Sequence, residues 1–156
     1  MTGREHEGEH TVASNRKARH DFDILETHEC GIVLTGSEVK SLRAGRASLV
    51  DCYGRIDRGE MWLEGMHVPP YEQGDTRAHQ PVRPRKLLLH RKEIESLGAQ
   101  TAEKGLALVP LRVYFTHGMC KVELALAKGR RRHEKRQAIA KREAQREMEQ
   151  AASRRR

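Results

Sequence analysis

The sequence predicts a mainly β protein: a small OB-type antiparallel β-barrel with two or three flanking helices and a basic C-terminal tail. Three observations support this fold class. Six short strand-like stretches fall within about 110 residues. Turn and loop residues separate these stretches, and all of the excess positive charge lies after them. A two-layer α+β sheet is the alternative architecture.

The expected strands share partly alternating apolar residues, the pattern of a strand with one buried face. They cover residues 22–26, 31–34, 48–56, 60–68, 106–115 and 119–127. We expect short connections between the first and second, the third and fourth, and the fifth and sixth of these strands, at residues 29–31, 57–59 and 116–118. The last strand shows the pattern most clearly, because Val122, Leu124 and Leu126 occupy alternate positions.

Two helices are expected between the strands. The first covers residues 37–45, with Gly36 or Ser37 as its N-terminal cap. The second covers residues 92–104. Residues 85–90 form either a further strand or the start of this second helix.

Net charge is concentrated at the C-terminus. Residues 128–156 contain 12 Lys or Arg and 4 Glu, so they carry the whole net charge of +8. A neutral body with a basic tail indicates a polyanionic partner, most often a nucleic acid, although such a tail can also serve solubility alone. We therefore divide the chain into a disordered N-terminus (1–14), an RNA-binding barrel (15–128) and a basic tail (129–156).

The tail is rich in helix-forming residues from 130 to 152. Its apolar stripe is thin and contains Ile139, Ala140, Ala144 and Met148. Burying so few apolar groups cannot offset the entropy lost when more than 20 residues become ordered. We expect a tail that is disordered when free and helical on a partner; a coiled coil would need a richer apolar repeat.

The composition favours neither a membrane protein nor an enzyme. No apolar run approaches the roughly 20 residues that cross a bilayer. The N-terminus lacks an apolar signal region, and three cysteines without a close pair suit a reducing cytosol. His117 and Cys120 have the spacing of half a zinc site, but no second pair follows. We expect no catalytic residue, no metal and no cofactor.

The six aromatic residues favour recognition of a folded RNA over base stacking along a single strand.

Five segments resemble the small protein B family and occur in the family's order. They are NRKARHDF (15–22), GSEVKSLRAG (36–45), RKLLLH (85–90), CKV (120–122) and AKGRRRHEKR (127–136). The resemblance spans roughly residues 15–143. It implies an OB-type barrel that binds the tRNA-like domain of transfer-messenger RNA (tmRNA, or SsrA RNA). It also implies delivery of tmRNA to stalled ribosomes for trans-translation, which tags the nascent peptide for degradation and rescues the ribosome.

The resemblance further implies which residues bind RNA. Seven residues match the family's tmRNA contacts or lie near them: Lys17, Arg19, His20, Glu29, Leu88, His90 and Lys121. Packing in the core is the alternative role for Leu88, and His90 stands where some members of the family have asparagine. Nine residues match the family's segment for the decoding centre of the ribosome: Lys128, Gly129, Arg130, Arg131, Arg132, His133, Glu134, Lys135 and Arg136.

The implied partners are tmRNA and the machinery that acts with it. They are the ribosome, through its small-subunit decoding centre and mRNA channel, and elongation factor Tu and alanyl-tRNA synthetase, both through tmRNA. The resemblance implies a cytoplasmic protein that is a monomer when free. The residues alone leave two other classes open. One is a ribosomal or initiation-factor-like OB protein, and the other is an RNA-processing hydrolase that uses His117 and Cys120 with a metal.

Overall fold

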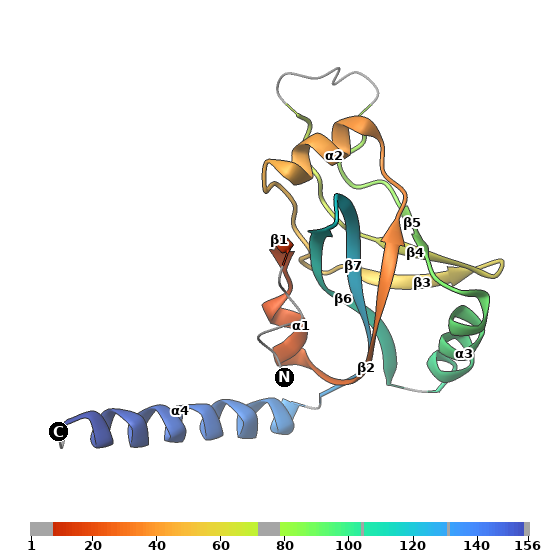
Figure 1. Ribbon diagram of the computed structural model, residues 1–156. Coiled ribbons are helices and arrows are strands. Elements are labelled where there is room, and N and C mark those ends of the chain that lie inside the picture. The colour runs from red at the N-terminus through yellow and green to blue at the C-terminus, as the bar shows by residue number, and fades with distance from the viewer. Residues whose placement is uncertain (1–7, 72–78, 104, 131, 155–156) are drawn as a thin grey trace.

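The computed structural model describes residues 8–71, 79–103, 105–130 and 132–154, with the backbone alone for residues 132–138. Six antiparallel strands form a closed ring (Figure 1). They are β2 (Phe22–Ile32), β3 (Tyr53–Asp57), β4 (Glu60–Glu64), β5 (Arg85–Leu88), β6 (Leu106–Thr116) and β7 (Met119–Gly129). Their order is β6-β3-β4-β5-β2-β7, and a further pairing of β6 with β7 closes the ring. The predicted mainly β fold and its small antiparallel barrel are confirmed.

An additional strand, β1 (Glu9–Ser14), pairs with β6 outside the ring. The expectation that residues 1–14 are disordered is therefore wrong for this part of the chain, while residues 1–7 lie outside the described residues. The strand forms because its backbone completes the free edge of β6, with His10 opposite Phe115. Val12 and Ala13 also pack against the barrel core, a contact that the local sequence pattern does not reveal.

The strand β2 is continuous where the sequence predicted two strands with a bend at 29–31. Its pairing with β7 runs through this segment without a break, and the irregularity lies earlier, between Ile24 and Glu26. Gly31 serves close packing instead of a turn. A Cβ atom at this position would lie 3.2 Å from the Cβ of Leu88 on the neighbouring strand.

The strands β3 and β4 are shorter than predicted. Beyond them, Ser48 and His67 form a single isolated bridge instead of extending the ladder. The predicted turn between these strands is confirmed, because Arg58 and Gly59 both have positive φ angles, 52° and 78°. Two such residues in succession are typical of the tightest hairpin turn.

The described residues form four helices: α1 (Arg16–Asp21), α2 (Gly36–Arg43), α3 (Arg91–Thr101) and α4 (Arg132–Arg154). The sequence patterns predicted α2 and α3, whereas α1 was not expected. The cap of α2 is Thr35 instead of Gly36 or Ser37. The Thr35 hydroxyl accepts a hydrogen bond from the Glu38 amide, and the Glu38 carboxylate accepts one from the Thr35 amide.

The helix α4 extends away from the barrel, at the end opposite α2 (Figure 1). It covers the segment in which helix formers were noted, so the expected helical tail is present. The structure has this helix in the isolated chain, whereas we expected disorder in the free protein. From residue 139 to residue 154 its side chains are exposed, so local propensity alone supports this part of the helix. No helix in the described part of the chain has both the length and the apolar character to cross a membrane.

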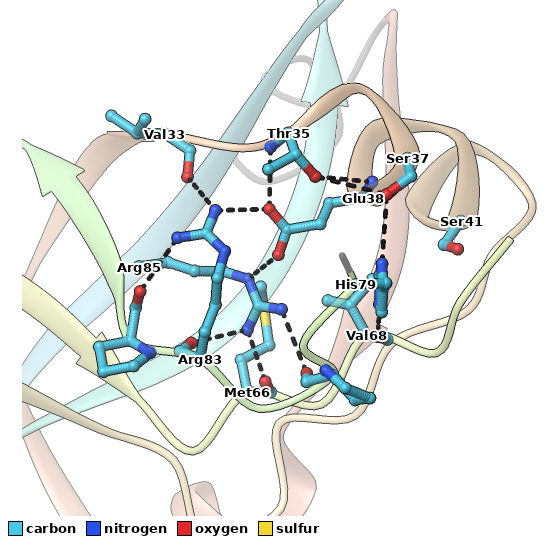
Figure 2. A network of polar contacts seen from close by, with 12 residues as sticks. Val33, Thr35, Ser37, Glu38, Ser41, Met66, Val68, His79, Arg83 and Arg85 are labelled. Carbon is cyan, nitrogen blue, oxygen red and sulfur yellow. Dashed lines mark hydrogen bonds and ion pairs between the residues drawn. The ribbon is translucent and has the colours of Figure 1, made fainter. Parts of the chain in front are cut away.

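A buried ion pair connects α2 to the barrel (Figure 2). Glu38 and Arg85 are almost completely buried, and their side chains lie 2.5 Å apart. Arg83 binds the second carboxylate oxygen of Glu38. The Arg85 guanidinium also donates hydrogen bonds to the backbone carbonyls of Met66 and Pro81. This network holds α2 and the segment before β5 at one end of the barrel.

Candidate nucleic-acid interface

The outward faces of β6, β7 and β2 form one continuous polar surface. Two rows of residues cross these strands: Arg112, Glu123 and Glu29 in one row, and Tyr114, Lys121 and Gly31 in the next. Leu88 of β5 lies opposite Gly31 and extends the second row. The register of the barrel therefore brings Glu29, Leu88 and Lys121 onto one face, although they come from three strands.

A hollow of about 610 Å³ opens on this surface. We call it the outer hollow, and eight residues line it: Glu9, Thr11, Arg19, Thr27, Glu29, Arg112, Tyr114 and Glu123. The helix α1 borders it, because Ala18 packs against Val109 and Leu111 on the outside of the barrel. This docking places the guanidinium of Arg19 4.0 Å from the Glu123 carboxylate.

Arg112 binds two of the carboxylates that line the outer hollow. Its guanidinium donates one hydrogen bond to Glu123, at 2.6 Å, and another to Glu9, at 2.9 Å. It also lies over the Tyr114 ring, 3.9 Å from the ring centre. Burial would lower the pKa of Arg112, but the hydrogen bonds to Glu123 and Glu9 raise it above its ordinary value.

A second, more apolar hollow adjoins Leu88 and Lys121. It is lined by Gly31, Phe115 and Met119 among others. The Leu88 side chain is 51% exposed, so the alternative that it packs in the core is wrong. Lys121 has no ion-pair partner in the described part of the chain, which leaves its ammonium available to an anion.

The remaining predicted RNA-binding residues lie at the edge of this surface or away from it. The His20 ring lies 2.9 Å from the Asp21 carboxylate. Lys17 pairs with Asp51 at 3.2 Å, in a different hollow that also contains Tyr53. His90 is exposed and precedes α3. The structure thus brings together Arg19, Glu29, Leu88 and Lys121, but it does not join Lys17 to them.

Several residues of the outer hollow were missed from the sequence. None of Tyr114, Arg112, Glu123 and Glu9 was predicted as a site residue. A local signal existed, because polar Arg112 and Tyr114 occupy alternate positions in an otherwise apolar strand. Their function nevertheless depends on the register with β7 and β2, which the sequence does not show.

The start of the basic tail belongs structurally to the barrel. Gly129 is the last residue of β7, and its amide donates a hydrogen bond to the Gly105 carbonyl. The Arg130 side chain donates to Asp23, at 2.9 Å, and to the backbone carbonyl of His20. Arg131 and the side chains of the predicted residues 132–136 lie outside the described residues, and the backbone of 132–136 is helical.

The histidine and cysteine considered for a metal site lie at the turn between β6 and β7. His117 is exposed with a φ angle of 49°, and burial raises the pKa of the Cys120 thiol to about 11. Burial likewise raises the pKa values of Cys30 and Cys52 to about 12. All three thiols are therefore protonated and unreactive at neutral pH. The described residues contain no group of three or more His, Cys, Asp or Glu side chains placed to hold a metal ion.

Comparison with known proteins identifies the family. The model of the SmpB protein family matches residues 12–154. This chain belongs to the SmpB family. The SsrA-binding protein of Desulforudis audaxviator is 63% identical over 146 residues, which cover 94% of this chain and 95% of that protein. The SsrA-binding protein of Thermobifida fusca is 59% identical over 150 residues, covering 96% and 94% of the two chains.

A solved structure of the family has the same fold. Its subject is described as "tmRNA-SmpB: a journey to the center of the bacterial ribosome". The matched chain is 47% identical, with a TM-score of 0.66 over 81% of this chain and 93% of its own length. The resemblance inferred from the five sequence segments is therefore confirmed.

Proposed function

We propose that this SmpB protein binds the tRNA-like domain of tmRNA and delivers tmRNA to stalled ribosomes for trans-translation. One observation carries the proposal. The resemblance places Glu29, Leu88 and Lys121 at the family's RNA contacts, and Arg19 near them. These four residues come from four elements of the chain and share one face of the barrel. The names of the relatives, SsrA-binding proteins, support the same conclusion.

The barrel and the tail have different tasks in this proposal. Specific contacts come from the neutral barrel. The basic segment from Lys128 to Arg136 leads from the end of β7 into the decoding centre and the mRNA channel of the small subunit. Elongation factor Tu and alanyl-tRNA synthetase act through the bound tmRNA. We expect the protein to be a monomer when free and to act in the cytoplasm.

The first test is the variant Lys121→Ala. Since the Lys121 ammonium has no ion-pair partner in the described residues, it is available to a phosphate. We expect the dissociation constant for the tRNA-like domain to rise several-fold. The slope of log affinity against log salt should become shallower by about 0.7–1, which corresponds to one phosphate contact. Titrations at several salt concentrations measure both quantities.

Arg58→Gly is the matched control for Lys121→Ala. It also removes one exposed cation, and glycine is suited to the positive φ angle of 52° at this turn. We expect its affinity and salt slope to stay close to wild type. If Lys121→Ala behaves like this control, Lys121 does not contact a phosphate.

The second test concerns His133 in the tail. We propose that its imidazole stacks on a ribosomal RNA base while neighbouring cations hold phosphates. His133→Ala removes no formal charge at neutral pH, so peptidyl transfer should fall at least about tenfold at every salt concentration. The double variant Lys135→Ala/Arg136→Ala should instead show a defect that depends on salt. Normal peptidyl transfer by His133→Ala would show that His133 does not stack and that this segment acts through its charge alone.

A further inference from the structure

Among the described residues, the carboxylate of Glu29 accepts one hydrogen bond, and its donor lies on another strand. The Tyr114 hydroxyl donates to Oε2 of Glu29 at 2.5 Å, and in doing so it reaches from β6 across β7 to β2. The other carboxylate oxygen, Oε1, has no hydrogen-bond partner among the described residues. Glu29 itself is exposed in the outer hollow. One oxygen is therefore fixed by the protein and the other is available to a ligand.

The Tyr114 ring is rigidly placed. The residue is only 2% exposed, and the Arg112 guanidinium covers the ring at 3.9 Å. Arg112 is in turn fixed by Glu123 and Glu9, one on each neighbouring strand. Burial, followed by the hydrogen bond to Glu29, raises the pKa of Tyr114 well above its ordinary value, so the hydroxyl keeps its proton to donate. The orientation of Glu29 therefore depends on an anchored donor.

The charge of the outer hollow determines what Glu29 can bind. Its lining contains three carboxylates, but only two guanidinium groups. Arg112 pairs with Glu9 and Glu123, and Arg19 lies nearest to Glu123, so Glu29 has no ion-pair partner in the described residues and the lining keeps a net negative charge. A phosphate placed against Glu29 would be repelled. A hydrogen-bond donor of RNA, a base N–H or a ribose 2′-hydroxyl, would be attracted.

We propose that Tyr114 is a positioning residue that orients the Glu29 carboxylate to accept a hydrogen bond from a base N–H or a ribose 2′-hydroxyl of the bound RNA. The proposal rests on the proposed function, because it needs the tRNA-like domain as ligand. It divides recognition between two chemistries on one face. Lys121 holds a phosphate, and the Tyr114–Glu29 pair recognises a donor group that a phosphate cannot supply.

The test begins with Tyr114→Phe, which keeps the ring and its contact with Arg112 but removes the hydroxyl. The dissociation constant for the transcribed tRNA-like domain should rise about 3- to 10-fold, because Glu29 is no longer held in one orientation. The salt slope should stay at the wild-type value, because no phosphate contact is lost. Tyr71→Phe is the control, since the Tyr71 hydroxyl makes no hydrogen bond in the described residues. Thermal melting of each variant verifies folding.

Coupling between the two residues separates positioning from a general structural effect. In a Glu29→Ala background, Tyr114→Phe should cause no further loss of affinity, because its target is absent. Equal losses in both backgrounds, or wild-type affinity of Tyr114→Phe, would overturn the assignment of Tyr114. Glu29→Gln should weaken binding, and tighter binding by this variant would show that Glu29 only repels the RNA.

These outcomes are distinct from failure of the proposed function. The wild-type chain is compared on the tRNA-like domain and on an unrelated hairpin of the same length. Equal affinity for both RNAs would overturn the proposed function and this inference with it. If the wild-type chain prefers the tRNA-like domain but Tyr114→Phe binds it with wild-type affinity, only the inference about Tyr114 is overturned.

Discussion

Glu38→Gln is expected to lower the free energy of unfolding by about 3–5 kcal/mol, because it leaves the buried Arg85 guanidinium without a counter-charge. Arg85 is fully buried, and its hydrogen bonds to the Met66 and Pro81 carbonyls do not supply negative charge. Figure 2 shows the Glu38 carboxylate between Arg83 and Arg85. Chemical denaturation of the variant and the wild type measures the difference.

Glu60→Gln is the matched control for this prediction. Glu60 forms an ion pair with Lys86 at 3.4 Å, and both side chains are substantially exposed. Exposed pairs contribute about 0–1 kcal/mol, so the control should unfold close to the wild-type denaturant concentration. Equal stability losses in both variants would show that burial of the Glu38–Arg85 pair has no special importance.

The pH dependence of stability provides a second readout of the same pair. Burial alone would raise the pKa of Glu38, but hydrogen bonds from Arg83, the Thr35 amide and Arg85 lower it below the ordinary value of 4.5. A lowered pKa in the folded state means that the carboxylate stabilises the fold above pH 4.5. This stabilisation is lost as the pH falls through the folded-state pKa. Glu38→Gln should lack this part of the acid-induced decrease in unfolding free energy.

The elements that could be predicted are those specified by neighbouring residues. The hairpin of β6 and β7 was predicted because both strands show their apolar pattern within the sequence, and a positive-φ glycine, Gly118, lies at the turn between them. The bend expected in β2 was wrong because glycine is common both in turns and at close strand contacts. Only the position of Leu88 on a strand more than 50 residues away distinguishes the two cases.

The same limit applies to the candidate site. Leu88 and Lys121 lie in the family segments, and Glu29 lies between the first two of them, but Tyr114 lies in none. Its contact with Glu29 joins residues 85 positions apart and depends on the β6–β7–β2 register. The ion pair of Glu38 and Arg85, 47 positions apart, was likewise absent from the sequence argument, although both residues lie in segments that resemble the family.

The second large effect is expected from removing the tail. We place the truncation after Arg130, because the Arg130 side chain still binds Asp23 and the His20 carbonyl of the barrel. The deleted part contains ten Lys or Arg and four Glu, a net charge of +6. The truncated protein should fold and retain specific binding of tmRNA, with weaker binding to unrelated RNA and a shallower salt slope. Tagging of nascent chains on stalled ribosomes should fall to background, because the segment that we propose enters the decoding centre is gone.

Ala140→Pro in the full chain separates the helix of the tail from its charge. Proline in the interior of α4 costs about 3 kcal/mol of helix stability and changes no charge. If the tail functions as a helix in a phosphate-lined channel, this variant should bind tmRNA with wild-type affinity and salt slope, yet tag poorly. Wild-type tagging by Ala140→Pro would show that the tail beyond this residue acts through its net charge and does not need to be helical. A truncated chain that loses specific tmRNA binding as severely as it loses tagging would contradict the division of tasks between barrel and tail.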